Sequence, residues 1–292
     1  MFSPFRVLSP TTLVEASGEL ERLGDQAVVY AGGAELLLLM RHGLLQPDYL
    51  VDVKPLPGFG EIIWDGEALE VGATVTHRRL ERDPLVQDHL PVLREAETHV
   101  GNIRVRAQGT IGGNLCFADP HADPGTALLV HDTRVTIASH RGERHLELAD
   151  FLVGTYETAL EPGELLTGLR VAPLPDGWGG AFLRIERFSR PTVNVAAGVA
   201  GHNGELGEVR LAVGCVGPKA MRLPEMEAQL RGLSPRDATR VIAESKPYLT
   251  ERLEPIGDLL GSAEYKIVIT SVLLARALEQ AVSEQVKGEA GT

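Results

Sequence analysis

Two glycine-dense stretches constrain this chain more than any other feature of its sequence. The first, Ala31–Glu35, lies between two apolar runs, and the second, Gln108–Asn114, contains a glycine pair. Glycine adopts positive φ without steric cost, so such stretches can turn several backbone N–H groups toward one anion. Each stretch alone is equally compatible with a tight turn. Together they predict a divided site that closes on a phosphate-bearing ligand.

The first glycine stretch lies inside a predicted βαβ unit. Residues 26–30 read as a short buried strand, residues 35–43 as a helix with its leucines on one side, and residues 49–53 as a second strand. Strand, glycine turn, helix and strand in this order predict parallel strands with a right-handed crossover. A helix is also expected at Leu13–Leu23, after a threonine that can cap it.

The rest of the chain mixes strands and helices without a repeat, which predicts an α+β fold. Asp65–Gly66 and Arg141–Gly142 lie between short apolar runs and predict two hairpins. Residues 173–180 are rich in proline and glycine and are the best linker candidate. The other expected elements are helices at 91–100, 226–230, 235–249 and 262–286, a strand at 165–171, and three consecutive antiparallel strands at 180–187, 193–202 and 207–216.

Charge and composition exclude several classes of function. The formal net charge of −12 argues against binding to nucleic acid or to an anionic membrane, since both need clustered Lys and Arg. The longest apolar run, Leu36–Met40, is too short to cross a bilayer, so no membrane insertion is expected. The first residues do not resemble a signal peptide. A cytoplasmic location is therefore expected.

The remaining motifs offer no catalytic side chains. Neither glycine stretch matches the Rossmann or P-loop pattern, so both of those assignments fail. The segment Asp119–Asp123 could accept hydrogen bonds from ribose hydroxyls, or it could simply cap the helix expected near Pro124. His121 and Asp123 lack an obvious third ligand, so no metal is expected. Cys116 is interpreted as a small buried residue, and the chemistry is assigned to a bound cofactor.

At this point the sequence resembles a known family, the FAD-binding medium subunits of the molybdenum hydroxylases. These include the flavoprotein subunit of aerobic carbon monoxide dehydrogenase and the flavin domain of xanthine dehydrogenase. The order and spacing of several segments carry the resemblance. They are Ala31–Glu35, Leu50–Val53, Val71–His77, Gly109–Asn114, Gly154–Leu166 and Gly261–Lys266.

The resemblance implies an α+β architecture in two domains. Residues 1–176 would form an FAD-binding domain of the vanillyl-alcohol oxidase (PCMH) type, with a βαβ subdomain at 1–56 and a mixed subdomain at 57–176. Residues 177–288 would form a small domain with a three-stranded antiparallel sheet and a helical bundle, of the carbon monoxide dehydrogenase flavoprotein type.

The resemblance also implies a site for non-covalently bound FAD. Residues 31–35 and 110–114 would hold the pyrophosphate through backbone N–H groups, and Asp123 would contact the ribose or pyrophosphate. Leu166 would pack on the adenine, while Arg184 and Tyr156 would lie toward the flavin. The residues expected at the site are Ala31, Gly32, Gly33, Ala34, Glu35, Leu36, Val100, Thr110, Ile111, Gly112, Gly113, Asn114, Asp123, Tyr156, Leu166 and Arg184.

The implied partners are a large molybdopterin-binding subunit and a small iron–sulfur subunit, in a hetero-oligomer such as a dimer of heterotrimers. The chain has no Cys-x-x-Cys pair, so the clusters would lie on the partner. Residues 188–194 lack the acidic residue usual in the family, which leaves quinone, oxygen and NAD open as acceptors. A stand-alone flavin reductase or oxidase on the same fold, and a scaffold subunit that has lost flavin, remain as alternatives.

Overall fold

A three-stranded parallel sheet at the N-terminus carries the predicted βαβ unit in the computed structural model, which describes residues 3–187 and 190–290. The strand order is β1-β3-β2, with α2 connecting β2 to β3. Of the three strands in this sheet, β1 alone was not predicted, because its three partly exposed residues show no alternation of apolar and polar side chains. The elements are β1 (Arg6–Leu8), α1 (Leu13–Leu23), η1 (Gly24–Gln26), β2 (Ala27–Tyr30), α2 (Leu36–Arg41) and β3 (Tyr49–Asp52).

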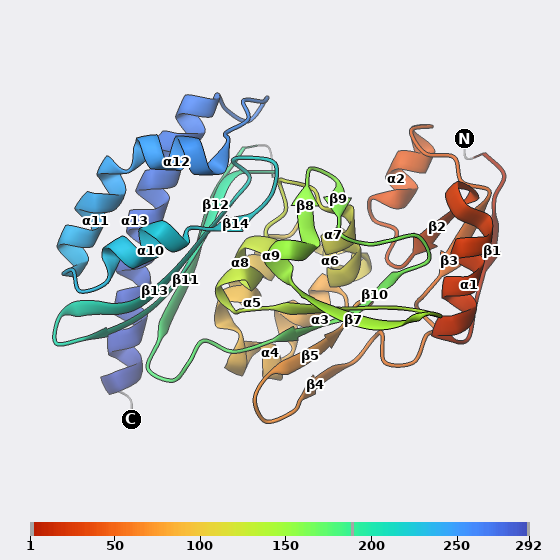
Figure 1. The fold of residues 1–292 in the computed structure, drawn as a ribbon, viewed down its shortest axis with the longest axis horizontal. Helices are drawn as coiled ribbons and strands as arrows, with labels where there is room; N and C mark the ends of the chain where they lie inside the picture. Colours follow the sequence, from red (N-terminus) through yellow and green to blue (C-terminus); the bar gives the residue numbers. More distant parts are fainter. Residues whose placement is uncertain (1–2, 188–189, 291–292) are drawn as a thin grey trace.

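A five-stranded antiparallel sheet forms the centre of the molecule, in the order β4-β5-β10-β6-β7 (Figure 1). Both predicted hairpins are confirmed, as β4–β5 and β6–β7. The strands are β4 (Ile62–Trp64), β5 (Leu69–Gly72), β6 (Arg134–Ser139), β7 (Gly142–Glu147) and β10 (Leu165–Val171). Six short helices connect β5 to β6: α3 (His77–Arg82), α4 (Pro84–His89), α5 (Pro91–His99), α6 (Ile103–Gln108), α7 (Ile111–Phe117) and α8 (Pro124–Val130). Between β7 and β10 lie α9 (Leu148–Phe151), β8 (Leu152–Gly154) and β9 (Glu157–Thr158).

A second antiparallel sheet and four helices follow. The three predicted strands are β11 (Gly179–Arg187), β12 (Arg190–His202) and β13 (Glu205–Gly214), and a two-residue strand β14 (Met221–Arg222) extends this sheet. The helices are α10 (Pro224–Leu230), α11 (Pro235–Glu244), α12 (Lys246–Leu253) and α13 (Ala263–Ala290). Within the predicted segment 188–194, positions 188–189 lie outside the described residues.

The prediction of one helix at 235–249 was wrong. The chain ends α11 at Glu244 and starts α12 at Lys246, with Pro247 in the first turn of α12. Proline has no N–H and its ring clashes with the preceding turn, so it favours the start of a helix over its interior.

Two hydrophobic cores hold these layers together. One lies around the central sheet and its helices, and the other lies between β11–β13 and α10–α13. Phe182, Ala196 and Ala212 extend from the C-terminal sheet into the first core, so the two parts share an apolar contact. In Figure 1 the N-terminal sheet and the C-terminal helices lie at opposite ends of the molecule. None of the described helices is both long and apolar enough to cross a membrane.

Candidate cofactor site

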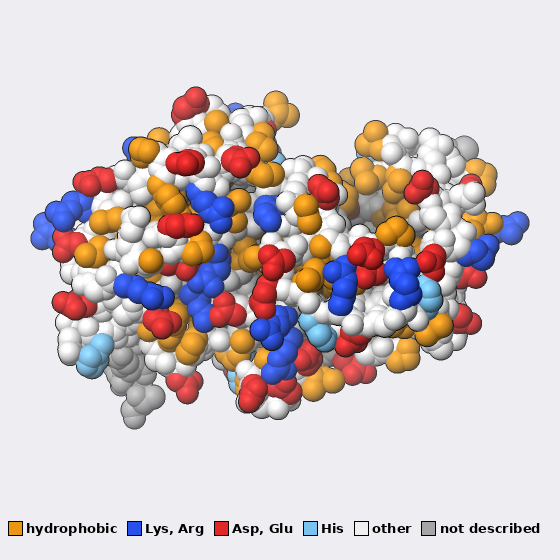
Figure 2. Space-filling model, viewed as in Figure 1, with side chains coloured by type: hydrophobic (Ala, Val, Ile, Leu, Met, Phe, Trp, Pro, Cys, Tyr) orange, Lys and Arg blue, Asp and Glu red, His pale blue; other side chains and the backbone are white. Residues whose placement is uncertain are grey.

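A cavity of about 860 Å³ lies between the N-terminal sheet and the central part of the molecule. Figure 2 shows a hollow beside α2 that is bordered by hydrophobic side chains. Its volume is in the upper part of the range of about 300–1,000 Å³ that is common for small-molecule sites. The predicted site residues that line it are Ala31, Gly32, Gly33, Ala34, Glu35, Leu36, Val100, Thr110, Gly112, Gly113, Asn114, Asp123, Tyr156, Leu166 and Arg184.

Ile111 is the predicted site residue that the structure does not place on this wall. Its side chain is 1% exposed and belongs to the central hydrophobic core. Its N–H donates to the carbonyl of Val75 at 3.0 Å. As the first residue of α7, Ile111 turns its side chain inward, so it positions the helix rather than contacting a ligand.

The first glycine stretch joins β2 to α2 and has unused backbone donors. Gly33 has φ of 73°, a conformation that favours glycine. The N–H groups of residues 32–36 make no hydrogen bond to any group in the described parts of the chain. Unpaired N–H groups are costly when a ligand or water does not satisfy them. A run of such donors on a cavity wall is suited to an anion.

The second glycine stretch differs from its prediction. Its residues 111–114 form the first turn of α7 and not a loop, and neither Gly112 nor Gly113 has positive φ. The N–H of Gly112 donates to Ala73 at 2.9 Å, and the N–H of Gly113 donates to the Thr110 hydroxyl at 3.1 Å. A methyl group on Gly112 would lie 2.6 Å from the carbonyl oxygen of Ala73. The glycine pair therefore permits close packing, and the prediction of a positive-φ nest here was wrong.

Asn114 supplies the clearest sign that this wall is built for a ligand. Its Oδ1 atom is buried and has no hydrogen-bond partner among the described residues, although the residue lines the cavity. A buried polar atom without a partner costs free energy, so such atoms are generally satisfied by water or by a ligand.

The two glycine stretches touch each other. A methyl group on Gly32 would lie 2.0 Å from the backbone oxygen of Gln108 and 3.0 Å from the Cα of Gly109. The contact between the stretches is consistent with one shared site. Among the described residues, the first stretch offers the unused N–H groups of residues 32–36, and the second offers that of Thr110.

Asp123 and Arg184 form a buried ion pair at the side of the cavity nearest the C-terminal sheet. Arg184 Nη1 lies 2.6 Å from Asp123 Oδ2, and Asn194 Nδ2 lies 2.8 Å from Asp123 Oδ1. Burial raises the pKa of Asp123, while Arg184 and Asn194 oppose that shift. Arg184 also contacts Glu186. Both residues line the cavity, but their charged groups are bound to each other, which the sequence did not show.

Aromatic side chains form another part of the wall. The rings of Phe117 and Tyr156 have centroids 5.1 Å apart. Tyr156 has φ of 57°, which is uncommon for a bulky residue, and its N–H donates to Ala118 at 2.9 Å. Tyr156 is 58% exposed, so an aromatic surface is available at the cavity.

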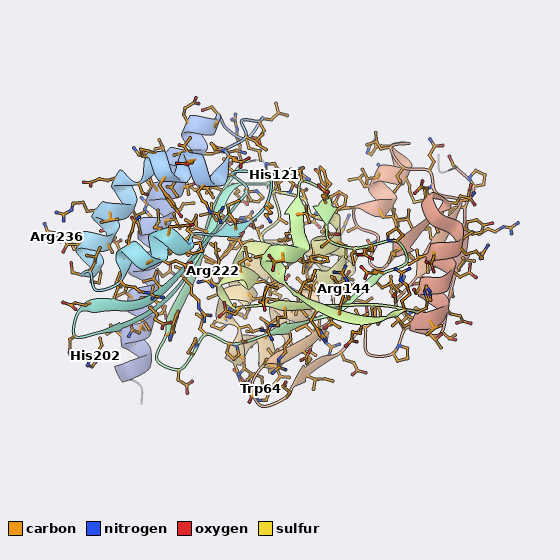
Figure 3. The ribbon with its side chains drawn as sticks, in the orientation of Figure 1. Trp64, His121, Arg144, His202, Arg222 and Arg236 are labelled. Carbon is orange, nitrogen blue, oxygen red and sulfur yellow. The ribbon has the colours of Figure 1, made fainter. Side chains whose placement is uncertain are left out.

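His121 links the cavity to the C-terminal helices (Figure 3). Its Nε2 lies 2.9 Å from Asp258 Oδ2, and Asp258 accepts a further bond of 2.7 Å from the buried Lys266. Hydrogen bonds with Asp119 and Asp258 raise the pKa of His121 against the effect of burial. Burial alone would raise the pKa of Asp258, but bonds from Lys266 and His121 and from a backbone N–H hold it at about 2.

Replacing His121 by asparagine should remove a stabilising contribution that depends on pH. The folded-state pKa of His121 is raised, so its contribution is fully present below about pH 6.5 and is lost as the pH rises through the folded pKa. We expect the melting temperature of the wild type to exceed that of His121→Asn at acidic pH and to converge with it at alkaline pH. A difference that stays constant from about pH 5.5 to about pH 9 would contradict this assignment.

Sequence reasoning missed several residues of the wall. Glu164 lines the cavity and is held by Arg144, labelled in Figure 3, whose Nη2 lies 2.6 Å from Oε2 of the carboxylate. His77 also lines the cavity and pairs with Glu97. Each partner lies 20 residues away along the chain. No local spacing signals such pairs, although the segments containing His77 and Glu164 had carried the family resemblance.

Comparisons with known proteins identify the ligand class. A model of the FAD binding domain in molybdopterin dehydrogenase matches residues 3–174, and a model of the CO dehydrogenase flavoprotein C-terminal domain matches residues 189–281. The chain is 32% identical to the nicotine 6-hydroxylase medium subunit of Paenarthrobacter nicotinovorans, over 94% of this chain and 96% of that one.

Solved structures agree with this match. The structure of carbon monoxide dehydrogenase from Hydrogenophaga pseudoflava, solved without the Mo-pyranopterin moiety of its cofactor, aligns with a TM-score of 0.92 at 29% identity, covering 97% of this chain and 99% of that one. Quinoline 2-oxidoreductase from Pseudomonas putida 86 aligns with a TM-score of 0.88 at 30% identity, covering 97% and 98%.

The residues on the cavity wall fit FAD. The unused N–H groups of residues 32–36 suit a pyrophosphate, the unpaired Oδ1 of Asn114 can accept a hydrogen bond from a ligand, and the cavity is large enough for much of a dinucleotide. The family models and the relatives agree on this cofactor. The chain therefore belongs to the FAD-binding subunits of the molybdenum hydroxylase family of oxidoreductases, and its cofactor is FAD.

Proposed function

We propose that this chain is the electron-transfer subunit of a molybdenum hydroxylase complex. A large molybdopterin-binding subunit hydroxylates the substrate, and a small iron–sulfur subunit passes the electrons to FAD on this chain. From there they leave to a quinone, oxygen or NAD. The three chains assemble as a heterotrimer that can dimerise.

The observation that carries the proposal is a dinucleotide-sized cavity whose described wall offers binding groups and whose cysteine is not activated. Burial raises the pKa of the Cys116 thiol on this wall to about 12, so it is not a thiolate nucleophile at neutral pH. The relatives named as a nicotine 6-hydroxylase medium subunit and as a 6-hydroxypseudooxynicotine dehydrogenase complex subunit are themselves parts of complexes. Both facts support a chain that holds a redox cofactor for a partner.

In this proposal the chain binds and orients the cofactor. The N–H groups of residues 32–36 hold the pyrophosphate, and the Asn114 amide contacts the same region. Leu166, 5% exposed on the wall, packs against the adenine, with Leu36 and Val100 adding apolar surface. When bound, FAD supplies the capacity to accept and release electrons.

The other polar groups shape the flavin end of the site. The Asp123–Arg184 ion pair fixes the position of the wall between the cavity and β11, since both side chains are almost fully buried. Tyr156 and Phe117 offer an aromatic surface on which the isoalloxazine ring can stack. We further propose a cytoplasmic location, because both cysteines are free thiols, which reducing compartments preserve.

The test combines metal analysis with flavin spectroscopy. An affinity-tagged chain purified from its own cells should carry molybdenum, iron and FAD in stoichiometric amounts, together with two further chains. The isolated chain should bind FAD, show the two visible flavin bands, and bleach with dithionite without turning over an organic substrate. Tagged protein that carries FAD but neither metal, and that oxidises a small substrate alone, would instead establish a stand-alone flavoenzyme.

A further inference from the structure

A buried histidine–glutamate pair lies next to the junction of the two glycine stretches. His77 is the first residue of α3 and Glu97 lies on α5, with Nδ1 of the histidine 2.8 Å from Oε2 of the glutamate. The two side chains are 3% and 0% exposed. His77 nevertheless lines the cavity. The pair therefore connects the protein interior to the cofactor site.

The imidazole ring of His77 faces the backbone of the second glycine stretch. The N–H of His77 donates to the oxygen of Gly109 at 3.1 Å. A methyl group on Gly109 would lie 3.1 Å from Cδ2 and 3.5 Å from Nε2 of His77, while a methyl group on Gly32 would lie 3.0 Å from the Cα of Gly109. Nε2 therefore lies close to the place where both stretches meet. Nε2 makes no hydrogen bond to a described residue. It is also not one of the fully buried polar atoms that lack a partner, so it is accessible from the cavity.

The carboxylate of Glu97 requires a proton on the histidine. Its second oxygen, Oε1, is buried without a partner, so within the described chain His77 is the group that hydrogen-bonds this carboxylate. A buried carboxylate is costly unless a donor or a positive charge faces it, so an ionised Glu97 needs the shared proton on Nδ1 of His77. Nε2 then holds either a lone pair or a second proton. Beside phosphate oxygens a lone pair is repelled, whereas a proton makes a charge-assisted hydrogen bond.

Among the described residues, the arginines of the cavity wall leave a pyrophosphate without an unpaired cation. Arginines Arg184 and Arg190 line the described wall, and each is paired, with Asp123 at 2.6 Å and with Asp119 at 3.4 Å. Carboxylates outnumber these arginines among the lining residues. The negative charge of a pyrophosphate therefore favours a protonated imidazole at the junction of the stretches.

We propose that the His77–Glu97 pair carries two protons when FAD is bound and that Nε2 of His77 donates a hydrogen bond to the FAD pyrophosphate. His77 is then a cofactor-binding residue, and Glu97 is a positioning residue that acts through it. This inference rests on the FAD site of the proposed function, but not on the partners or the acceptor.

The first experiment compares two matched variants in helix α5. Glu97→Gln keeps an acceptor for the Nδ1 proton but removes the negative charge that favours the second proton. Glu95→Gln makes the same change at an exposed pair, in which Glu95 Oε1 lies 3.1 Å from Nε2 of His99. We expect Glu97→Gln to weaken FAD and ADP binding by at least about tenfold, because charge-assisted hydrogen bonds are worth that much. Glu95→Gln should bind both ligands as the wild type does.

A second measurement observes the protons of His77 directly in the wild-type protein. In protein labelled with ¹⁵N-histidine and saturated with FAD, both ring nitrogens of His77 should show the chemical shifts of a protonated imidazole, with His77→Gln identifying the signals. The ³¹P resonances of bound FAD should also differ between wild type and His77→Gln.

The outcomes separate this inference from the proposed function. If the wild type binds FAD but its His77 carries one proton, or if both glutamine variants at Glu95 and Glu97 bind FAD and ADP equally well, the inference is wrong and the proposed function stands. If the wild type binds no FAD, both fall. A tenfold weaker Glu97→Gln with an unchanged melting temperature and a doubly protonated His77 supports the inference.

Discussion

Replacing Gly32 by alanine should weaken FAD binding by about ten- to a hundredfold, through the same strain that over-packing imposes in protein cores. The added methyl group would lie 2.0 Å from the backbone oxygen of Gln108, which is far inside van der Waals contact. The methyl carbon is attached directly to the backbone and the oxygen belongs to the backbone, so neither can rotate away. Relief requires the two glycine stretches to separate, which moves the N–H groups of residues 32–36 away from a pyrophosphate held between them.

Gly32 does not adopt a positive φ, so its backbone angles tolerate alanine and the expected effect comes from the steric contact alone. A matched glycine-to-alanine control is available in the same chain. Gly18 lies on α1, where an added methyl group meets nothing within 4 Å. Gly18→Ala should bind FAD normally and be slightly more stable, since alanine favours helix. Titration of flavin fluorescence gives the affinities, and the melting temperature reports folding. Equal FAD affinity of Gly32→Ala and the wild type would show that the stretches do not close on one ligand.

The elements that the sequence predicted correctly are those with a local signal. The strand β2, the glycine turn and helix α2 follow one another with clear apolar runs, and the hairpin turns contain glycine where the chain reverses. The strand β1 has three residues and pairs with β3, far along the chain. Because its stability comes from that pairing and not from its own pattern, no property of residues 6–8 alone predicts it.

The second glycine stretch shows how tertiary packing overrides local propensity. A glycine pair usually favours a turn, and glycine in a helix costs about 1 kcal/mol relative to alanine. Here the Thr110 hydroxyl caps α7, and the absence of a side chain at Gly112 lets the helix pack on Ala73. The position of the stretch at the site was predictable from its composition. Its conformation depended on Ala73, which the sequence does not connect to it.

The polar partners of the site residues were the least predictable part. Asp123 pairs with Arg184 across 61 positions, and His121 pairs with Asp258 across 137 positions. The sequence identified Asp123 and Arg184 as site residues through resemblance to a family, but nothing in their local surroundings showed that they neutralise each other. Such pairs are properties of the folded chain, since they depend on how β11 and the segment between α12 and α13 pack against the loop before α8.

Replacing Arg184 by methionine should reduce the free energy of unfolding by about 3–5 kcal/mol, the usual cost of leaving a buried charge without its partner. Asp123 is 4% exposed and, among the described residues, would keep only the amide of Asn194 as a side-chain donor. The double variant Asp123→Asn with Arg184→Met should recover much of this loss, because no buried charge then remains unpaired. Urea denaturation monitored by circular dichroism gives both values.

The size of this effect depends on burial, which a surface pair on the same molecule can test. Arg134 lies 2.6 Å from Glu147, but their side chains are 65% and 48% exposed. Arg134→Met should therefore change stability by less than about 1 kcal/mol, as exposed ion pairs do. If Arg184→Met were as mild as Arg134→Met, Asp123 would have to be neutral in the folded protein. In that case the pair would be a hydrogen bond and not an ion pair, and the double variant would recover nothing. The three variants together thus decide whether the wall of the flavin site is held by charge or by packing.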